Sequence, residues 1–476
     1  MTLADTRMPG ALPLRGPGAA APDRTPDRER LSIFVVLYLV CVALPLFFPL
    51  GPLSMSNLKL LLLILTAPLM LRTWMGHFGR VRLPDILFPA FIFWTFLAVL
   101  KNNPSMAVES TGSAGTEMLG GYFVGRAFIR TPGQFLAFAR GLMVTVLFLM
   151  PFAIHEALTG RLLLGEILAM VPGMKSVTTN VSNMRFGLDR AQTVFVHPIH
   201  FGLFCSMALS LAFVSLKDEM PKMRRYVLSL VMAITGCLSL SSGALLAILL
   251  FAGLVTWRWM LDRVKARWWV LIGLFALAYV VVDLLSNRTP LRVFMSYATF
   301  SPETAYWRGL ILQYGMENVW ANPLFGLGFN DWARPGFMIT SSVDNFWLLT
   351  AMRYGIPAFV MLVIGMLVPL LRIMFRTFDA DPRLMNIRLA WVFTFVGLSF
   401  TLSTVHVWGT AFSLVFVMFG AGLWLISAEP AAPREEGDGA GAEPAGTRTT
   451  RFSRFAPAAI RRTSGQTERK PDRFRR

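Results

Sequence analysis

The chain is dominated by long apolar runs separated by shorter polar connections. Eleven runs are plain, at about residues 31–50, 58–71, 84–100, 141–158, 199–216, 226–240, 243–257, 268–285, 357–371, 390–406 and 409–427. Because about 20 apolar residues are needed to cross roughly 30 Å of hydrocarbon as a helix, such runs predict transmembrane helices. A twelfth, less apolar segment at 112–129 contains Gly121-Tyr-Phe-Val-Gly125, a small-residue spacing typical of closely packed membrane helices. The pattern therefore predicts an all-α, polytopic bundle of about twelve transmembrane helices.

The composition agrees with a membrane protein and excludes several other classes. Of 476 residues, 55% are apolar and only 15% are charged, whereas soluble proteins have about 45–50% apolar and about 25% charged residues. A soluble enzyme, a disordered protein and a fibrous repeat are therefore excluded. The three cysteines, Cys41, Cys205 and Cys237, all lie in apolar runs, so we expect neither a disulfide framework nor a metal site built from them.

The net charge of +18 is large enough for a nucleic-acid-binding protein, but its distribution favours a membrane surface. With twelve spans, both termini and the short loops on the same side carry most of the 45 Lys and Arg residues, which predicts cytoplasmic termini. Residues 1–30 and 428–476 are rich in Pro, Ala, Gly and Arg, and are predicted to be disordered on either side of a bundle at 31–427. Their charge suits anionic inner-leaflet lipids, so we expect no nucleic-acid partner.

Two long outer segments, at about 159–198 and 286–356, carry basic residues that do not help to set the topology. These residues are Arg161, Lys175, Arg185, Arg190, Arg288, Arg292, Arg308, Arg334 and Arg353. Because the arginine fork matches two phosphate oxygens, these arginines are candidates for binding an anion. The alternative is that they are solvated loop charges of little energetic weight.

The second outer segment predicts one surface helix followed by a glycine turn. Ser301-Pro302-Glu303 has the features of a helix start, and the helix should run to about Trp320. In the turn that follows, Gly326 and Gly328 allow backbone angles or close contacts that other residues forbid.

A second helix is predicted from Phe346 to Tyr354, with a break at Gly355-Ile-Pro357. Asp344 lies two residues before this helix begins, near its N-terminus. One interpretation is that Asp344 caps the helix. The other is that it is an ionised carboxylate, stabilised by the helix dipole and facing the arginines, which acts as a general base.

Two further motifs have weaker functional interpretations. Asp379-Ala-Asp381 is similar to a metal-binding DxD motif, but its place in a predicted cytoplasmic turn favours a solvated turn. His197-Pro-Ile-His200 has no carboxylate or cysteine partner nearby in the sequence, which favours a structural or glycan-contacting role over metal binding.

Together these motifs resemble a known superfamily. Arg308, Asn322-Pro-Leu-Phe-Gly-Leu-Gly328 and Val343-Asp-Asn-Phe-Trp-Leu348 look like the large periplasmic loop of O-antigen ligases and O-antigen or exopolysaccharide polymerases. Arg185-Phe-Gly-Leu-Asp-Arg190 and Phe195-Val-His-Pro198 resemble the arginine-bearing segment of the same proteins, and the segment from Glu109 to Arg126 resembles the polymerase branch. The resemblance covers roughly residues 85–425.

The resemblance implies a multi-pass protein of the bacterial inner membrane, with its active site in a helical periplasmic loop. The implied reaction is a glycosyl transfer without cofactor or metal that inverts the anomeric carbon and uses an undecaprenyl-pyrophosphate-linked oligosaccharide as donor. Arg185, Arg190 and Arg308 are then assigned to the pyrophosphate and Asp344 to the acceptor hydroxyl. Four residues are assigned supporting roles, namely His197, Gly326, Gly328 and Asn345.

Several alternatives stay open. Ligases of the superfamily carry His-Asn where this chain has Asp344-Asn345, which favours a polymerase over a ligase that transfers glycan to lipid A–core. A polymerase implies partners besides membrane lipids, namely a chain-length regulator and a flippase. The protein could instead be a flippase or solute transporter, but the span centres are nearly free of ionisable residues, which argues against a path through the bundle.

Overall fold

The fold was analysed in a computed structural model that describes residues 29–50, 53–172, 174–178, 184–287, 290, 293 and 302–429. The chain divides into two units, 1–431 and 432–476, and all of the described residues belong to the first. The predicted disorder of the two termini, apart from residues 29–30 and 428–429, and the expected roles of Arg288, Arg292 and Ser301 lie outside the described residues.

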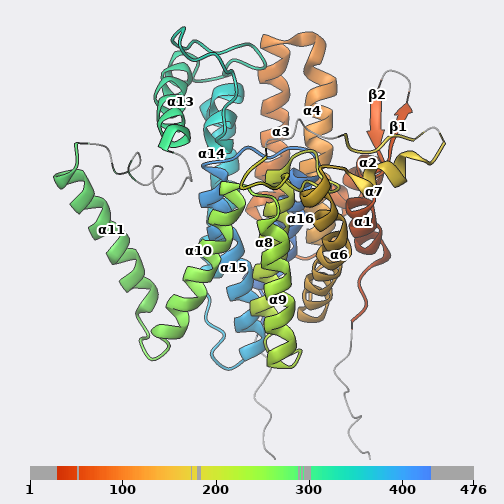
Figure 1. The fold of residues 1–476 in the computed structure, drawn as a ribbon, viewed down its shortest axis with the longest axis vertical. Helices are drawn as coiled ribbons and strands as arrows, with labels where there is room; N and C mark the ends of the chain where they lie inside the picture. Colours follow the sequence, from red (N-terminus) through yellow and green to blue (C-terminus); the bar gives the residue numbers. More distant parts are fainter. Residues whose placement is uncertain are drawn as a thin grey trace, which may run out of the picture. The chain divides into compact units, whose positions relative to one another are not determined.

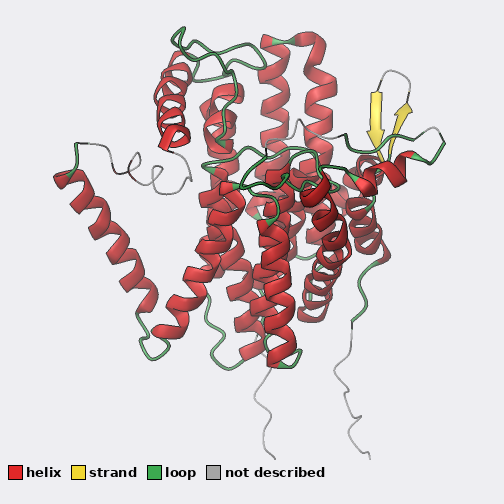
Figure 2. Ribbon diagram, viewed as in Figure 1, coloured by secondary structure: helices red, strands yellow, loops and turns green. Residues whose placement is uncertain are grey.

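The described chain is almost entirely helical (Figures 1 and 2). The α-helices are α1 (Ile33–Ala43), α2 (Asn57–Trp74), α3 (Leu83–Asn102), α4 (Ala107–Gly115), α5 (Gly121–Phe128), α6 (Pro132–Thr159), α7 (Leu163–Ala169), α8 (Pro198–Ser215), α9 (Lys222–Cys237), α10 (Ser242–Met260), α11 (Arg267–Leu285), α13 (Pro302–Ala321), α14 (Phe346–Met374), α15 (Pro382–Leu402) and α16 (Thr410–Gly422). Short helical turns are η1 (Pro104–Met106), the π-helical η2 (Thr116–Gly120) and η3 (Leu423–Ile426).

In the described part of the chain, eight helices are long and apolar enough to cross a membrane, namely α2, α3, α6, α8, α10, α11, α14 and α15. Two further apolar helices, Ile33–Ala43 and Thr410–Ile426, are shorter. Each of the twelve apolar segments expected from the sequence overlaps a helix, although several extend beyond its ends. The all-helical fold is therefore confirmed, and the count of twelve spans stays a prediction.

The first predicted span, 31–50, is wrong in its second half. Helix α1 ends at Ala43, just before Leu44-Pro45, because the residue before a proline is disfavoured in the helical conformation. The chain then forms an antiparallel hairpin of β1 (Phe47–Leu50) and β2 (Leu53–Ser56), in which Phe47 is opposite Ser56.

The segment predicted to pack closely through Gly121 and Gly125 does so against α16. A Cβ atom added to Gly121 would lie 2.5 Å from the backbone oxygen of Ser413, and one added to Gly125 would overlap that of Val417. Gly420 makes the reciprocal close approach to Tyr122 of α5. The small residues therefore allow the two backbones to touch, as in other membrane helix pairs.

The helices differ in how deeply they lie in the bundle. Of the residues in the 18-residue apolar stretch of α8, 89% are buried inside the protein. In the corresponding stretch of α11, none is buried. Helix α8 packs against α9, α10 and α15, and the fully buried Trp391 of α15 donates its indole N–H to the Met418 backbone oxygen of α16. Helices α8, α15 and α16 therefore form the core, and α11 lies outside it.

Candidate functional site

The first arginine segment, residues 184–197, is held against the end of α6 and the turn between α9 and α10. The buried carboxylate of Glu156 accepts two backbone hydrogen bonds, from Gln192 N at 3.0 Å and Thr193 N at 2.8 Å. The amide of Ala191 donates to the Leu238 oxygen at 3.0 Å. The backbone of this segment is thus fixed directly beside its two arginines.

Both arginines of this segment also donate to carbonyl groups of the α9–α10 turn. Arg185 Nη1 lies 2.9 Å from the Leu240 oxygen, and Arg190 Nε lies 3.3 Å from the Ser239 oxygen. Burial lowers the pKa of Arg190 to about 10, and the neighbouring charge of Arg185 lowers it further. The two guanidinium groups are therefore close enough to repel each other, which favours an anionic ligand between them.

The third arginine, Arg308, lies on α13. This helix runs from Pro302 to Ala321, which confirms the predicted helix and its end before Asn322-Pro323. The Nε and Nη1 atoms of Arg308 are buried and have no hydrogen-bond partner among the described residues. Burial lowers the pKa of its guanidinium, Asp344 opposes this shift, and Arg185 adds to it. A buried donor without a partner costs free energy, so this side chain is suited to a ligand.

Asp344 is exposed at the start of α14 and is not its capping residue. Asn345 caps the helix instead, because its side-chain oxygen accepts a hydrogen bond from Leu348 N at 3.0 Å. The Asp344 carboxylate accepts a hydrogen bond from the Ser342 hydroxyl at 3.1 Å. The interpretation of Asp344 as a helix cap is therefore wrong, and its carboxylate stays accessible.

His197 links the two arginine segments electrostatically. Its side chain caps α8 by accepting from Ile199 N at 3.1 Å, which is a structural role. Burial lowers its pKa to about 4, Arg190 and Arg185 add to this effect, and Asp344 opposes it. Arg185 thus interacts electrostatically with Arg190, His197 and Arg308, and Asp344 does so with His197 and Arg308. We call Arg185, Arg190, His197, Arg308 and Asp344 the arginine cluster.

The glycine turn after α13 is hydrogen-bonded to the backbone of α14 next to the break in that helix. Gly326 and Gly328 have φ angles of +61° and +63°, and Gly355 has φ +82° inside α14, as the sequence predicted for a turn and a helix break. Leu327 N and Gly328 N donate to the backbone oxygens of Met352 and Arg353 at 2.8 and 2.9 Å. The glycines therefore position the start of α14, and with it Asp344, rather than the ligand itself.

The segment from α9 to the break in α14 matches a known protein family. Residues 227–363 match the family model described as O-antigen ligase. This confirms the superfamily resemblance. A comparison with curated proteins found no significant match.

The segment that matches the family model, residues 227–363, contains Arg308, the glycine turn and Asp344-Asn345. Arg185, Arg190 and His197 precede it in the chain. Together with the eight long apolar helices, the family match indicates a multi-pass bacterial membrane protein.

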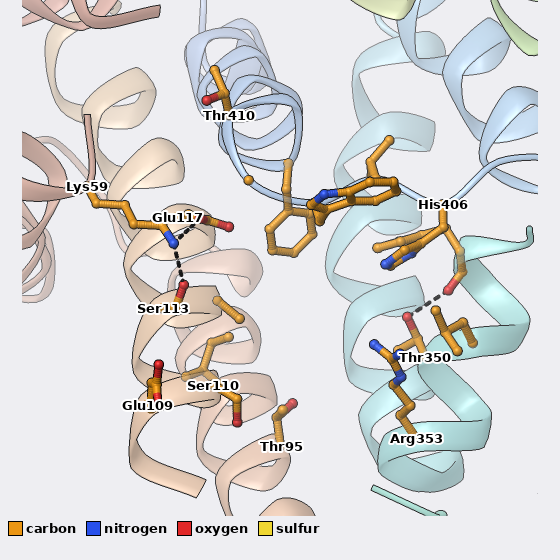
Figure 3. A pocket seen from close by; sticks show the side chains of 18 of the residues that line it. Lys59, Thr95, Glu109, Ser110, Ser113, Glu117, Thr350, Arg353, His406 and Thr410 are labelled. Carbon is orange, nitrogen blue, oxygen red and sulfur yellow. Dashed lines mark hydrogen bonds and ion pairs between the residues drawn. The ribbon is translucent and has the colours of Figure 1, made fainter. Parts of the chain in front are cut away.

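A pocket of about 570 Å³ lies on the other face of the first turns of α14 (Figure 3). Asn345 and Leu348 face Arg308, whereas Phe346, Thr350 and Arg353 line this pocket. Its described lining residues include Arg353, one of the candidates for anion binding, but none of the residues assigned to the reaction or to supporting roles. Its volume is within the usual range of about 300–1,000 Å³ for ligand sites.

The end of α3 is hydrogen-bonded to the glycine turn through two residues for which the sequence predicted no role. The Asn102 side chain donates to the backbone oxygens of Phe325 and Gly326, at 3.3 and 3.2 Å. Asn103 accepts from Phe329 N at 2.7 Å. The only sequence signal for these contacts is an Asn-Asn pair at the end of an apolar run.

The two weaker motifs have structural roles. Asp381 caps α15 by accepting from Leu384 N at 3.0 Å, which confirms the turn interpretation. The ring centroids of His197 and His200 are 6.1 Å apart, and no group of three potential metal ligands lies together in the described part of the chain.

Proposed function

We propose that this protein is a glycosyltransferase of the bacterial inner membrane that joins lipid-linked oligosaccharide repeat units into an exopolysaccharide or O-antigen at the periplasmic face. Undecaprenyl pyrophosphate is the leaving group. The observation that carries the proposal is the guanidinium of Arg308, two of whose nitrogens are buried without a partner among the described residues, within electrostatic range of Asp344 and Arg185.

The arginines act on the leaving group. When the bond between the anomeric carbon and the pyrophosphate oxygen breaks, both bonding electrons stay on that oxygen and its negative charge grows. Arg308, Arg185 and Arg190 stabilise this charge, because donors already fixed in place do not need to reorganise during the reaction. The anchoring of Arg185 and Arg190 to backbone carbonyls supports such preorganisation.

Asp344 acts on the acceptor. Its carboxylate accepts the proton of an acceptor hydroxyl while that oxygen forms a bond to the anomeric carbon, on the side opposite to the departing pyrophosphate. The product therefore has the inverted anomeric configuration. No step requires a metal or a cofactor. Because Asn345 caps α14, Asp344 is free for this role.

The Asp344-Asn345 pair supports a polymerase, in which a growing chain is transferred from its lipid carrier onto a new repeat unit. The alternative is a ligase that transfers the glycan onto lipid A–core or another acceptor. In cells without the protein, accumulation of single lipid-linked repeats would favour the polymerase. Accumulation of lipid-linked polymer would favour the ligase.

Two substitutions test the reaction. Arg308→Ala and Asp344→Asn should each lower polymer formation at least 100-fold in cells, at an unchanged protein level. Arg161→Ala is the matched control, because Arg161 is an exposed outer arginine that pairs with Glu166 at 2.8 Å. Normal polymer in both site variants would exclude the proposed chemistry.

A transporter is separated from an enzyme by reconstitution. We expect purified protein in vesicles to transfer label between two lipid-linked saccharides without a gradient or ATP. If labelled saccharide instead crosses the vesicle membrane and no new glycosidic bond forms, the protein is a flippase or transporter.

A further inference from the structure

The pocket of about 570 Å³ has no part in the chemistry proposed above. One wall is formed by α2, α4 and η2, with Lys59, Ser113 and Glu117 among its side chains (Figure 3). The other wall is formed by α14 and the segment before α16, with Arg353 and His406. We call this space the α4–α14 pocket.

The charges of the first wall are largely neutralised by each other. Lys59 Nζ lies 3.1 Å from the Glu117 carboxylate and 2.8 Å from the Ser113 hydroxyl. Glu117, whose side chain is 8% exposed, also accepts a hydrogen bond from the backbone of Gly409. The Lys59–Glu117 pair therefore presents a fixed polar surface with little net charge, and Glu109 adds a further carboxylate to this wall.

The opposite wall has polar groups with unused hydrogen-bonding or charge capacity, although the Arg353 side chain also forms a hydrogen bond with that of Tyr354. The guanidinium of Arg353 lies 5.0 Å from the ring centroid of Phe329 and has no carboxylate partner among the described residues. His406 Nδ1 is buried, and no hydrogen-bond partner for it is found in the described chain. Burial lowers the pKa of His406 to about 4, and the charge of Arg353 adds to this effect, so the ring is neutral at pH 7.

Besides Phe329, the lining contains six further aromatic residues, namely Phe47, Phe91, Phe346, Tyr354, Trp408 and Phe412. Flat apolar faces combined with hydroxyls and fixed hydrogen-bonding groups suit a ligand that has both apolar C–H faces and many hydroxyls. A polyprenyl chain would leave the polar groups without partners. A phosphate group would meet the carboxylates of Glu109 and Glu117.

The helix that carries Glu117 is irregular at this point. Residues Thr116–Gly120 form a π-helical segment between α4 and α5. Such segments are rare and occur frequently at functional sites. The irregular segment therefore supports a binding role for this wall.

The geometry points to a carbohydrate-binding subsite: we propose that the α4–α14 pocket binds a sugar of the acceptor glycan, an assignment that rests on the proposed function. Two of its lining residues, Val196 and Phe346, stand next to His197 and Asn345 in the chain. Asp344, the proposed base for the acceptor, lies two residues before Phe346 in the chain, and Arg308 lies on the opposite face of the start of α14 from the pocket.

Two substitutions within the pocket test this proposal. Ala114→Phe fills the space without removing a polar group, because Ala114 lines the pocket from α4. Arg353→Gln removes the cation of the second wall, which has no carboxylate partner among the described residues, and keeps a polar side chain. Val108→Phe is the control, because Val108 is 77% exposed on the same helix and is not among the described lining residues.

The measurement uses the purified full-length protein and two probes. One is a repeat-unit oligosaccharide, without lipid or phosphate, released by mild acid from the polysaccharide of wild-type cells. The other is inorganic pyrophosphate. We expect Ala114→Phe and Arg353→Gln to weaken oligosaccharide binding at least tenfold, and to change pyrophosphate binding less than twofold. Val108→Phe should bind both probes as the wild type does.

Different results would exclude the carbohydrate subsite and the proposed reaction at the arginine cluster. If the wild type does not bind the oligosaccharide, or if both pocket variants bind it with unchanged affinity, the subsite is excluded, even where Arg308→Ala still abolishes transfer. If Arg308→Ala instead leaves transfer and pyrophosphate binding intact, the proposed reaction fails at the arginine cluster. Pyrophosphate binding that persists in the pocket variants also shows that they are folded.

Discussion

Arg308 keeps two of its guanidinium nitrogens away from water without giving them a partner among the described residues. Such an arrangement destabilises a folded protein unless a ligand supplies the missing acceptors. Functional residues are often kept at a cost in stability, and replacing them can stabilise the protein. Arg308 has the features of a residue that is kept at a cost in stability, whereas Arg161 forms an ion pair with Glu166.

We therefore expect Arg308→Met to be inactive and yet more stable than the wild type, by about 1 kcal/mol, because the buried unpaired donors are removed. The thermal midpoint of the purified protein measures this change. Added pyrophosphate should raise the midpoint of the wild type and leave that of the variant unchanged. A lower midpoint in the variant would indicate that Arg308 has a structural role.

His197 makes the stability depend on pH. Its pKa is about 4 in the folded protein and about 6.5 in an unfolded chain. Between these values the unfolded chain binds more protons, so the contribution of His197 to stability falls as the pH decreases from 6.5 to 4. Above pH 7 the histidine is neutral in both states and the effect vanishes.

His197→Asn should reduce this loss of stability, because asparagine can cap α8 and does not titrate. The measurement is the thermal midpoint at several pH values between 4 and 7.5. Some dependence should remain, since the pKa of His406 is also about 4. His77→Asn, at an exposed position after α2, serves as the control and should follow the wild-type curve.

Among the elements, the broken helix α14 depends on one backbone angle. Gly355 has φ +82°, and a Cβ atom at this position would overlap the backbone oxygen of Leu324. Gly355→Ala should therefore destabilise the protein by about 2 kcal/mol or more, because it combines strain with a clash. Gly273→Ala on α11 should be neutral or stabilising, since nothing lies within 4 Å of its added Cβ.

Thermal midpoints and the yield of folded membrane protein measure both glycine variants. If Gly355→Ala were as stable as Gly273→Ala, the close contact between the glycine turn and the break in α14 would not determine where the start of α14 lies.

Local sequence patterns predicted the helices of the second outer segment. They could not predict the contacts between segments that are distant in the sequence. Proline, glycine and capping signals act within a few residues, and these signals gave the end of α13 and the break at Gly355. They did not separate Asp344 from Asn345 as the cap, because both residue types are good caps. The pairing of Glu156 with the amides of residues 192 and 193 depends on tertiary packing, which no local pattern encodes.

At the scale of the whole molecule, the proposal requires the arginine cluster and the basic loops to lie on opposite sides of the membrane. Ser342 stands beside Asp344, and Lys217 lies in the predicted cytoplasmic loop after α8. Both are exposed. In a variant without the three native cysteines, we expect Ser342→Cys to react with an impermeant thiol reagent in intact spheroplasts. Lys217→Cys should react only after permeabilisation.

The opposite labelling pattern would place the arginine cluster in the cytosol and exclude a periplasmic reaction. Labelling of both positions only after permeabilisation would contradict the proposed topology as well. The cysteine-free parent, which lacks Cys41, Cys205 and Cys237, should remain unlabelled in either condition.

The first two turns of α14 have one face toward Arg308 and the other toward the α4–α14 pocket. A helix advances by about 100° per residue. A single residue inserted after Asn345 would therefore rotate Leu348 and Thr350 away from their neighbours together, so neither side could adapt alone. An insertion near Gly336, whose added Cβ would meet nothing within 4 Å, would leave both faces in register. During evolution, changes in loop length are thus easier to accommodate before Asp344 than after it.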